Sequence, residues 1–166
     1  DMVDIILDRK GIVDKYIGDA IMAFFGAPVK HDDDVLQAVH TGFDMLEALK
    51  AFNKRQAMRS RPQFRIGIGI NYGLVTVGNI GSEKKMDYTV IGDMVNLASR
   101  LEELTKIYDV PFLISDSVYT RVKKDIPCRL IDKVMVKGKT QATRIFYPKK
   151  QTSKAEVKGW KLHHMG

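Results

Sequence analysis

Lys15 and Asp19 are two opposite charges placed around a predicted chain reversal, a spacing that allows them to act together. They lie between Gly11 and Gly26, where two apolar runs flank a Gly18-Asp19 pair. Glycine at the first of two loop positions predicts a β-hairpin, because it suits the turn that matches strand twist. In that register Lys15 lies opposite Met22 in an otherwise apolar row. We expect this hairpin to lie in the core.

The hairpin alone leaves the role of these two charges open. Burying either charge without a partner is costly. Lys15 and Asp19 therefore either form a local ion pair, or Lys15 covers its stem while its ammonium group reaches water, or the two serve a ligand.

A second group of polar residues, Asn96, Arg100 and Glu103, is predicted on one helix face. Gly92-Asp93 begins this helix, and its apolar stripe consists of Met94, Leu97, Ala98, Leu101 and Leu104. The polar residues fall on the opposite face, about one turn apart. Taken alone, they indicate a solvated face with an ion pair between Arg100 and Glu103.

The remaining elements predict an α+β domain with a mostly antiparallel sheet covered by helices. Residues 1–10 read as the last turns of a helix, and a second helix begins near Val35 after a group of aspartates. Its apolar stripe consists of Val35, Val39, Phe43, Leu46 and Leu49. Residues 64–78 read as a second hairpin turning at 72–73, residues 78–85 as a loop, and residues 86–91 as a short strand. A strand at 111–114, a short helix to Val122 and a third hairpin, of 129–136 with 142–147, follow.

Glycine alternates with isoleucine in the predicted strand that contains Gly67 and Gly69. The missing side chains indicate that another backbone or a ligand comes close. Close packing of a helix would explain the pattern equally well.

Composition favours one soluble, cytoplasmic domain with an anionic ligand. The 166 residues are 45% hydrophobic, enough for one real core, and carry a net charge of +7. No apolar run is long enough to span a bilayer, and we find no recognised nucleic-acid module. The single cysteine, Cys128, excludes an internal disulfide and reads as a buried or half-buried thiol.

Four ordered stretches resemble the catalytic domain of class III nucleotidyl cyclases. They are Lys15–Gly26, Arg65–Gly73, Asp87–Glu102 and Val136–Lys139. The resemblance covers about residues 1–150, and we expect 151–166 to be a basic tail or linker. It implies a ferredoxin-like cyclase fold.

The resemblance also implies roles for the residues that face a nucleotide. Asp19 would be one of two aspartates that hold two divalent ions, Mg²⁺ or Mn²⁺. Lys15 and Thr89 would recognise the purine, in the combination typical of bacterial adenylyl cyclases.

Four further roles follow from the same resemblance. Asn96 would orient the ribose, and Arg100 would neutralise charge on the reacting phosphate. Lys137 and Lys139 would hold the distal phosphates. In this family a head-to-tail homodimer is formed, in which one subunit supplies the metal and base residues and the other supplies the Asn and Arg residues.

One expected element is missing from the sequence. The family's first strand carries the other metal aspartate and precedes the opening helix, whose Asp1, Asp4 and Asp8 are poor substitutes. We expect truncation rather than loss of a metal ligand, because Lys15 and Asp19 occur together with Asn96 and Arg100. The 166-residue piece alone is then expected to be unstable or inactive.

The sequence therefore predicts an adenylate cyclase that converts ATP to 3′,5′-cyclic AMP and pyrophosphate. Any contact with a membrane would be made by domains outside this chain. Three alternatives stay open: a guanylyl cyclase, a catalytically incomplete cyclase-like module for nucleotide binding or dimerisation, and an unrelated binding domain of sheet and helices. Comparing ATP with GTP as substrates separates the first, and metal-dependent ATP binding separates the last.

Overall fold

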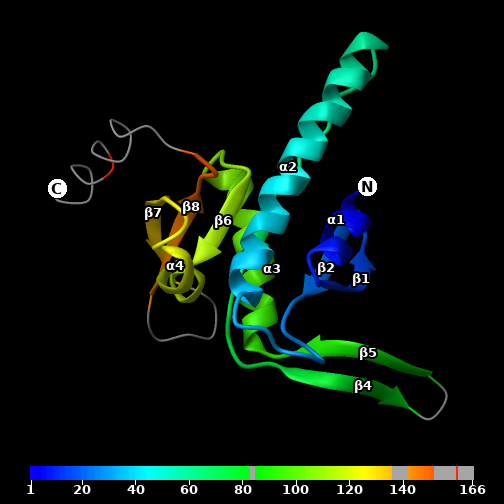
Figure 1. Cartoon of the computed structure of the whole chain (residues 1–166), viewed down its shortest axis with the longest axis vertical. Helices are drawn as coiled ribbons and strands as arrows, with labels where there is room; N and C mark the ends of the chain where they lie inside the picture. The colour runs from blue at the N-terminus through cyan, green and yellow to red at the C-terminus, as the bar shows by residue number, and fades with distance from the viewer. Residues whose placement is uncertain (83–84, 136–141, 152–159, 161–166) are drawn as a thin grey trace. The chain divides into compact units, whose positions relative to one another are not determined.

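The computed structural model describes residues 1–82, 85–135, 142–151 and 160 of the chain (Figure 1). It is an α+β structure in two compact units. The first unit contains residues 1–66 and 73–96, and the second contains residues 67–72 and 97–166.

The first unit contains the predicted hairpin of residues 12–24. Strands β1 (Ile12–Ile17) and β2 (Ala20–Phe24) pair antiparallel, and Lys15 lies opposite Met22 as expected. Gly18 has φ +63°, the left-handed conformation that glycine adopts without strain. The expected core location is wrong, because residues 15–20 are exposed and Ile17 is 58% exposed. The hairpin is therefore a surface element with a half-buried base.

Helices α1 (Met2–Asp8) and α2 (Asp34–Met58) belong to the same unit. The stripe predicted on α2 is buried at Val39 and Phe43 and half-buried at its other positions. The guanidinium group of Arg9, just after α1, forms an ion pair with Asp44 of α2 at 2.6 Å.

The second hairpin was predicted wrongly. Strand β3 (Ile68–Ile70) pairs parallel with β6 of the second unit, whereas β4 (Thr76–Ser82) pairs antiparallel with β5 (Lys85–Ile91). Residues 78–82 thus continue a strand that was expected to be a loop. The glycines at 78 and 81 suggested a loop because glycine is common in loops, but a strand can also contain glycine where no side chain has to pack.

The second unit is built on a four-stranded mixed sheet in the order β3-β6-β8-β7. Its other strands are β6 (Phe112–Ser115), β7 (Cys128–Val134) and β8 (Thr143–Pro148), and α4 (Asp116–Val122) follows β6. The antiparallel β7–β8 pair confirms the third predicted hairpin. Residues 136–141, between these strands, lie outside the described part.

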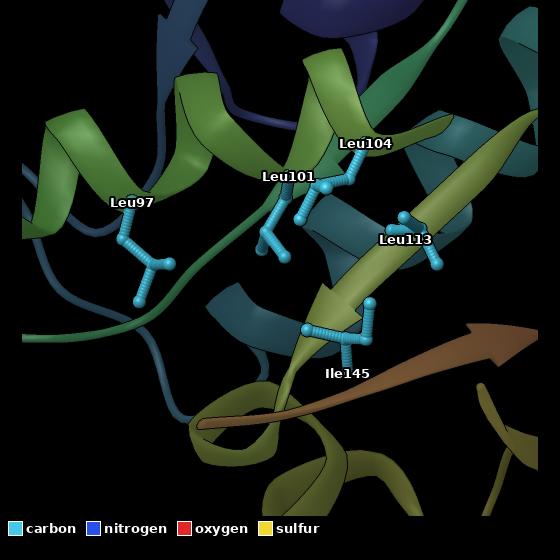
Figure 2. Close-up of a cluster of buried hydrophobic side chains, with 5 residues drawn as sticks. All are labelled: Leu97, Leu101, Leu104, Leu113 and Ile145. Atoms are coloured by element: carbon cyan, nitrogen blue, oxygen red, sulfur yellow. The ribbon is translucent and has the colours of Figure 1, made fainter. Parts of the chain in front are cut away.

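Helix α3 (Asp93–Ile107) supplies much of the core of this second unit. Figure 2 shows Leu97, Leu101 and Leu104 on one face of the helix, with Leu113 of β6 and Ile145 of β8 beside them. The predicted stripe is confirmed at these three leucines, and its other two positions are half-buried.

The two glycines of the β3 region are explained by helix packing. A Cβ atom on Gly69 would meet the backbone of Ala98 and Glu102 in α3, and one on Gly67 would meet the Thr105 hydroxyl. Of the two alternatives left open by the sequence, close helix packing is the one observed.

No helix among the residues described here combines the length and apolar character needed to cross a bilayer.

Candidate functional site

Lys15 and Thr89 share one buried carboxylate, that of Asp14. The Thr89 hydroxyl donates a hydrogen bond to Asp14 Oδ2 at 2.7 Å, and Lys15 Nζ lies 3.8 Å from Asp14 Oδ1. The Asp14 side chain is 1% exposed, Thr89 is 5% exposed, and the Lys15 side chain is 46% exposed. Strands β1 and β5 thus bring the two residues expected to read a purine to the same anion.

A β-bulge in β1 produces this arrangement. Val13 pairs with Ala23 and Lys15 pairs with Met22, so Asp14 is an extra residue on its strand. In a regular strand neighbouring side chains point to opposite faces. A bulge interrupts that alternation and redirects a side chain, so adjacent Asp14 and Lys15 can interact. Asp14 rather than Asp19 is therefore the acidic partner that the structure gives to Lys15.

Sequence reasoning missed Asp14. It is a charged residue within an apolar run, directly before a lysine whose charge did require a partner. That signal was present, but strict alternation placed Asp14 on the strand face opposite Lys15. The bulge could not be inferred from the alternation of residue types alone.

Asp19 follows Gly18 in the hairpin turn and is exposed. A carboxylate is the donor that Mg²⁺ prefers, and Mg²⁺ is commonly held by one or two carboxylates together with substrate phosphates. Asp19 fits as one such donor. Within the described ranges, however, no three His, Cys, Asp or Glu residues gather as a metal site. Asp19 would therefore need donors from a nucleotide or from residues beyond those described.

Asn96 and Arg100 lie one turn apart on α3, and both are exposed. Arg100 Nη1 forms an ion pair with Glu103 Oε2 at 2.7 Å, with side chains 50% and 55% exposed. This confirms the expected Arg100 to Glu103 pair.

The remaining expected phosphate residues, Lys137 and Lys139, lie outside the described residues. Cys128 is half-buried, as expected, and burial raises its thiol pKa to about 12. A thiol with so high a pKa is a poor nucleophile and a poor metal ligand.

Comparison with known proteins gives consistent matches. The family described as "Adenylate and Guanylate cyclase catalytic domain" matches residues 2–150. An adenylate cyclase from Anabaena cylindrica is 43% identical over 143 residues, which cover 82% of this chain and 28% of that protein. This chain therefore spans less than a third of that relative.

Two solved structures have a similar fold. The adenylyl cyclase CyaB from P. aeruginosa gives a TM-score of 0.83 at 35% identity, covering 91% of this chain and 78% of that one. The guanylyl cyclase Cya2 gives 0.77 at 35% identity, covering 89% and 74%. With a family match over nearly its whole length, this chain belongs to the adenylate and guanylate cyclase catalytic domain family.

Proposed function

We propose that this chain is the catalytic domain of an adenylate cyclase, which converts ATP to 3′,5′-cyclic AMP and pyrophosphate in the cytoplasm. The observation that carries the proposal is the shared carboxylate: Lys15 and Thr89, far apart in the sequence, both contact Asp14. The Lys15 ammonium group and the Thr89 hydroxyl, both held by Asp14, are suited to form hydrogen bonds with the edge of a purine. The similarity to an adenylate cyclase from Anabaena cylindrica supports the same substrate.

The reaction is attack of the ribose 3′-hydroxyl on the α-phosphorus, with pyrophosphate as the leaving group. Two divalent ions, when bound, would make the hydroxyl more acidic and offset phosphate charge. Asp19 would contribute one carboxylate to them. Its place on a turn, beside a glycine, leaves the oxygens open to a ligand.

Asn96 and Arg100 serve the transition state in this proposal. Asn96 orients the ribose by hydrogen bonding, and Arg100 neutralises charge that grows on the phosphate oxygens. Their exposure on adjacent turns of α3 supports these roles. Lys137 and Lys139 would hold the distal phosphates.

We further propose a head-to-tail homodimer in which Asp19 and Lys15 act with Asn96 and Arg100 of the second copy. Mixing two inactive variants tests this arrangement. Asp19→Ala and Arg100→Ala should each be inactive, whereas equal mixing should restore about a quarter of normal activity, because half of the dimers regain one intact site. No recovery, after subunit exchange has been verified, would contradict a site shared between subunits.

A guanylyl cyclase is the second candidate, because Cya2 is as similar in sequence as the adenylyl cyclase structure. The experiment is a cyclic-nucleotide assay on the full-length protein with ATP and with GTP, each with Mn²⁺. Preference for ATP supports the proposal, and preference for GTP contradicts its substrate. Absence of both cyclic products would contradict cyclase activity and favour a nucleotide-binding or dimerisation module.

The role of Asp19 is tested in the same assay. Asp19→Ala should abolish turnover without changing thermal stability, because the turn carboxylate is exposed. Asp32→Ala is the matched control, since Asp32 is also an exposed surface acid. Equal activity of the two variants would refute the metal role.

A further inference from the structure

Asp14 places a buried carboxyl group beside the residues proposed to read the base. Its side chain is 1% exposed and lies at the β-bulge of β1. A buried carboxylate is costly unless it is paired and hydrogen-bonded. Thr89 and Lys15 provide that compensation, through the 2.7 Å hydrogen bond and the 3.8 Å approach. Because burying the Asp14 carboxylate costs free energy, we infer that this side chain has a role other than keeping the protein surface soluble.

The hydrogen bond fixes the direction of the Thr89 proton. A hydroxyl carries one hydrogen, and a carboxylate can only accept. Thr89 Oγ1 donates that hydrogen to Asp14, so only lone pairs remain on the oxygen. With Thr89 5% exposed, bulk water offers little competition for the proton. Toward any further partner Thr89 therefore acts as an acceptor.

An acceptor at this place distinguishes the two common purines. The 6-amino group of adenine donates a hydrogen bond, whereas the 6-oxo group of guanine accepts one. The Lys15 ammonium group is a donor only, and it suits the unprotonated N1 of adenine rather than the N1–H of guanine. The Lys15 donor and the Thr89 acceptor, both held by the Asp14 carboxylate, thus match N1 and the 6-amino group of adenine. They are mismatched with N1–H and the 6-oxo group of guanine.

We propose that Asp14 is a positioning residue for base selection, which acts by holding the Thr89 proton away from the base. This inference rests on the proposed cyclase function. Asp14 itself does not touch the nucleotide. Preference for ATP over GTP then depends on the Asp14 carboxylate, which contacts the residues that read the base rather than the base itself.

The test measures kcat/KM for ATP and GTP in full-length Asp14→Asn protein. The neighbouring ammonium group favours the amide oxygen on its own side, so the amide nitrogen turns to Thr89 and frees its proton for a 6-oxo group. The ratio of the ATP to the GTP value should fall about 10-fold. Asp14→Glu keeps a carboxylate and should recover most of the preference.

A double-variant cycle tests whether Asp14 acts through Thr89. Thr89→Val removes the hydroxyl at nearly constant shape and should lower the ratio as Asp14→Asn does. Combining both changes should lower it no further, because coupled residues are not additive. Additive losses would overturn the proposed route. The ratio compares two substrates in one preparation, so it does not depend on the fraction of folded protein.

A measurement on the unaltered protein covers the case in which the Asp14 variants do not fold. Inosine triphosphate carries the 6-oxo group without the 2-amino group of guanine, and it should be converted about 10-fold less efficiently than ATP. Equal conversion, or an unchanged ratio in Asp14→Asn, overturns the role of Asp14 while adenylate cyclase activity stands. An unaltered protein without cyclase activity refutes the proposed function instead.

Discussion

Replacing Arg100 with alanine should reduce turnover far more than it reduces stability. Among the described residues Arg100 forms an ion pair with Glu103, and both side chains are about half exposed. Such a pair contributes about 0.3–0.5 kcal/mol to the free energy of unfolding. The melting temperature should therefore fall by only about 1 °C.

The expected loss of activity is much larger. Removing one preorganised donor to a developing negative charge costs about 10²–10³ in kcat, or about 2.7–4 kcal/mol. Arg100→Ala should show this loss in kcat and equally in kcat/KM, since the contact forms in the transition state. Arg100→Lys keeps the charge without the planar fork and should give an intermediate value.

Glu103→Ala is the matched control, because it breaks the same ion pair and leaves the guanidinium group in place. The assay is the initial rate of cyclic AMP formation by full-length protein over a range of ATP concentrations, with melting temperatures measured in parallel. If Glu103→Ala loses as much activity as Arg100→Ala, or if only KM changes, the phosphate role of Arg100 is refuted.

Three predictions concern the fold. Gly69→Ala should lower the free energy of unfolding by about 1–3 kcal/mol, because the added Cβ atom would meet the α3 backbone. Gly78→Ala is the control, because a Cβ atom there would lie in open space, and it should leave the free energy of unfolding nearly unchanged. Both values come from denaturant titration. Cys128 should react with a thiol reagent at pH 8 about 10³-fold more slowly in the folded chain than in denaturant, because burial raises its pKa to about 12; equal rates would contradict this burial. The Tyr108 hydroxyl donates a hydrogen bond to Asp132 and lowers the pKa of that carboxyl. Tyr108→Phe should therefore be less stable at neutral pH. This difference should begin to shrink below about pH 4, where the Asp132 carboxyl of the unfolded chain takes up its proton, and should vanish only once the pH has fallen through the lower pKa of the folded chain.

Elements defined by short-range patterns were predicted well. The hairpin with Gly18 in its turn and the leucine stripe of α3 depend on residues within a few positions of one another, and both are confirmed. Parallel pairing of β3 with β6 joins segments more than 40 residues apart. The pattern around Gly69 indicated a close neighbour, but local sequence could not identify that neighbour as α3.

The site was predictable only in part, because its residues come from separate segments. Resemblance to a family, rather than residue spacing, suggested a link between Lys15 and Thr89, and the structure joins them through Asp14. Asp14 escaped prediction because a bulge changes which side chains share a face. The roles of Asp19 and Arg100 remain predictions for the assays above.

The three sheets formed by the described residues differ in their number of strands. Strands β6 and β8 each have neighbours on both sides within a four-stranded sheet, whereas β1–β2 and β4–β5 are two-stranded ribbons. Two-stranded ribbons are marginally stable by themselves, so local opening should cost less there than in the larger sheet.

The two ribbons carry Lys15 and Thr89, and Asp19 lies in the turn of the first. Their amide hydrogens should consequently exchange with solvent sooner than those of β6. A bound nucleotide would slow this exchange by ordering the ribbons. The ligand would then supply part of the free energy that holds its own binding residues in place.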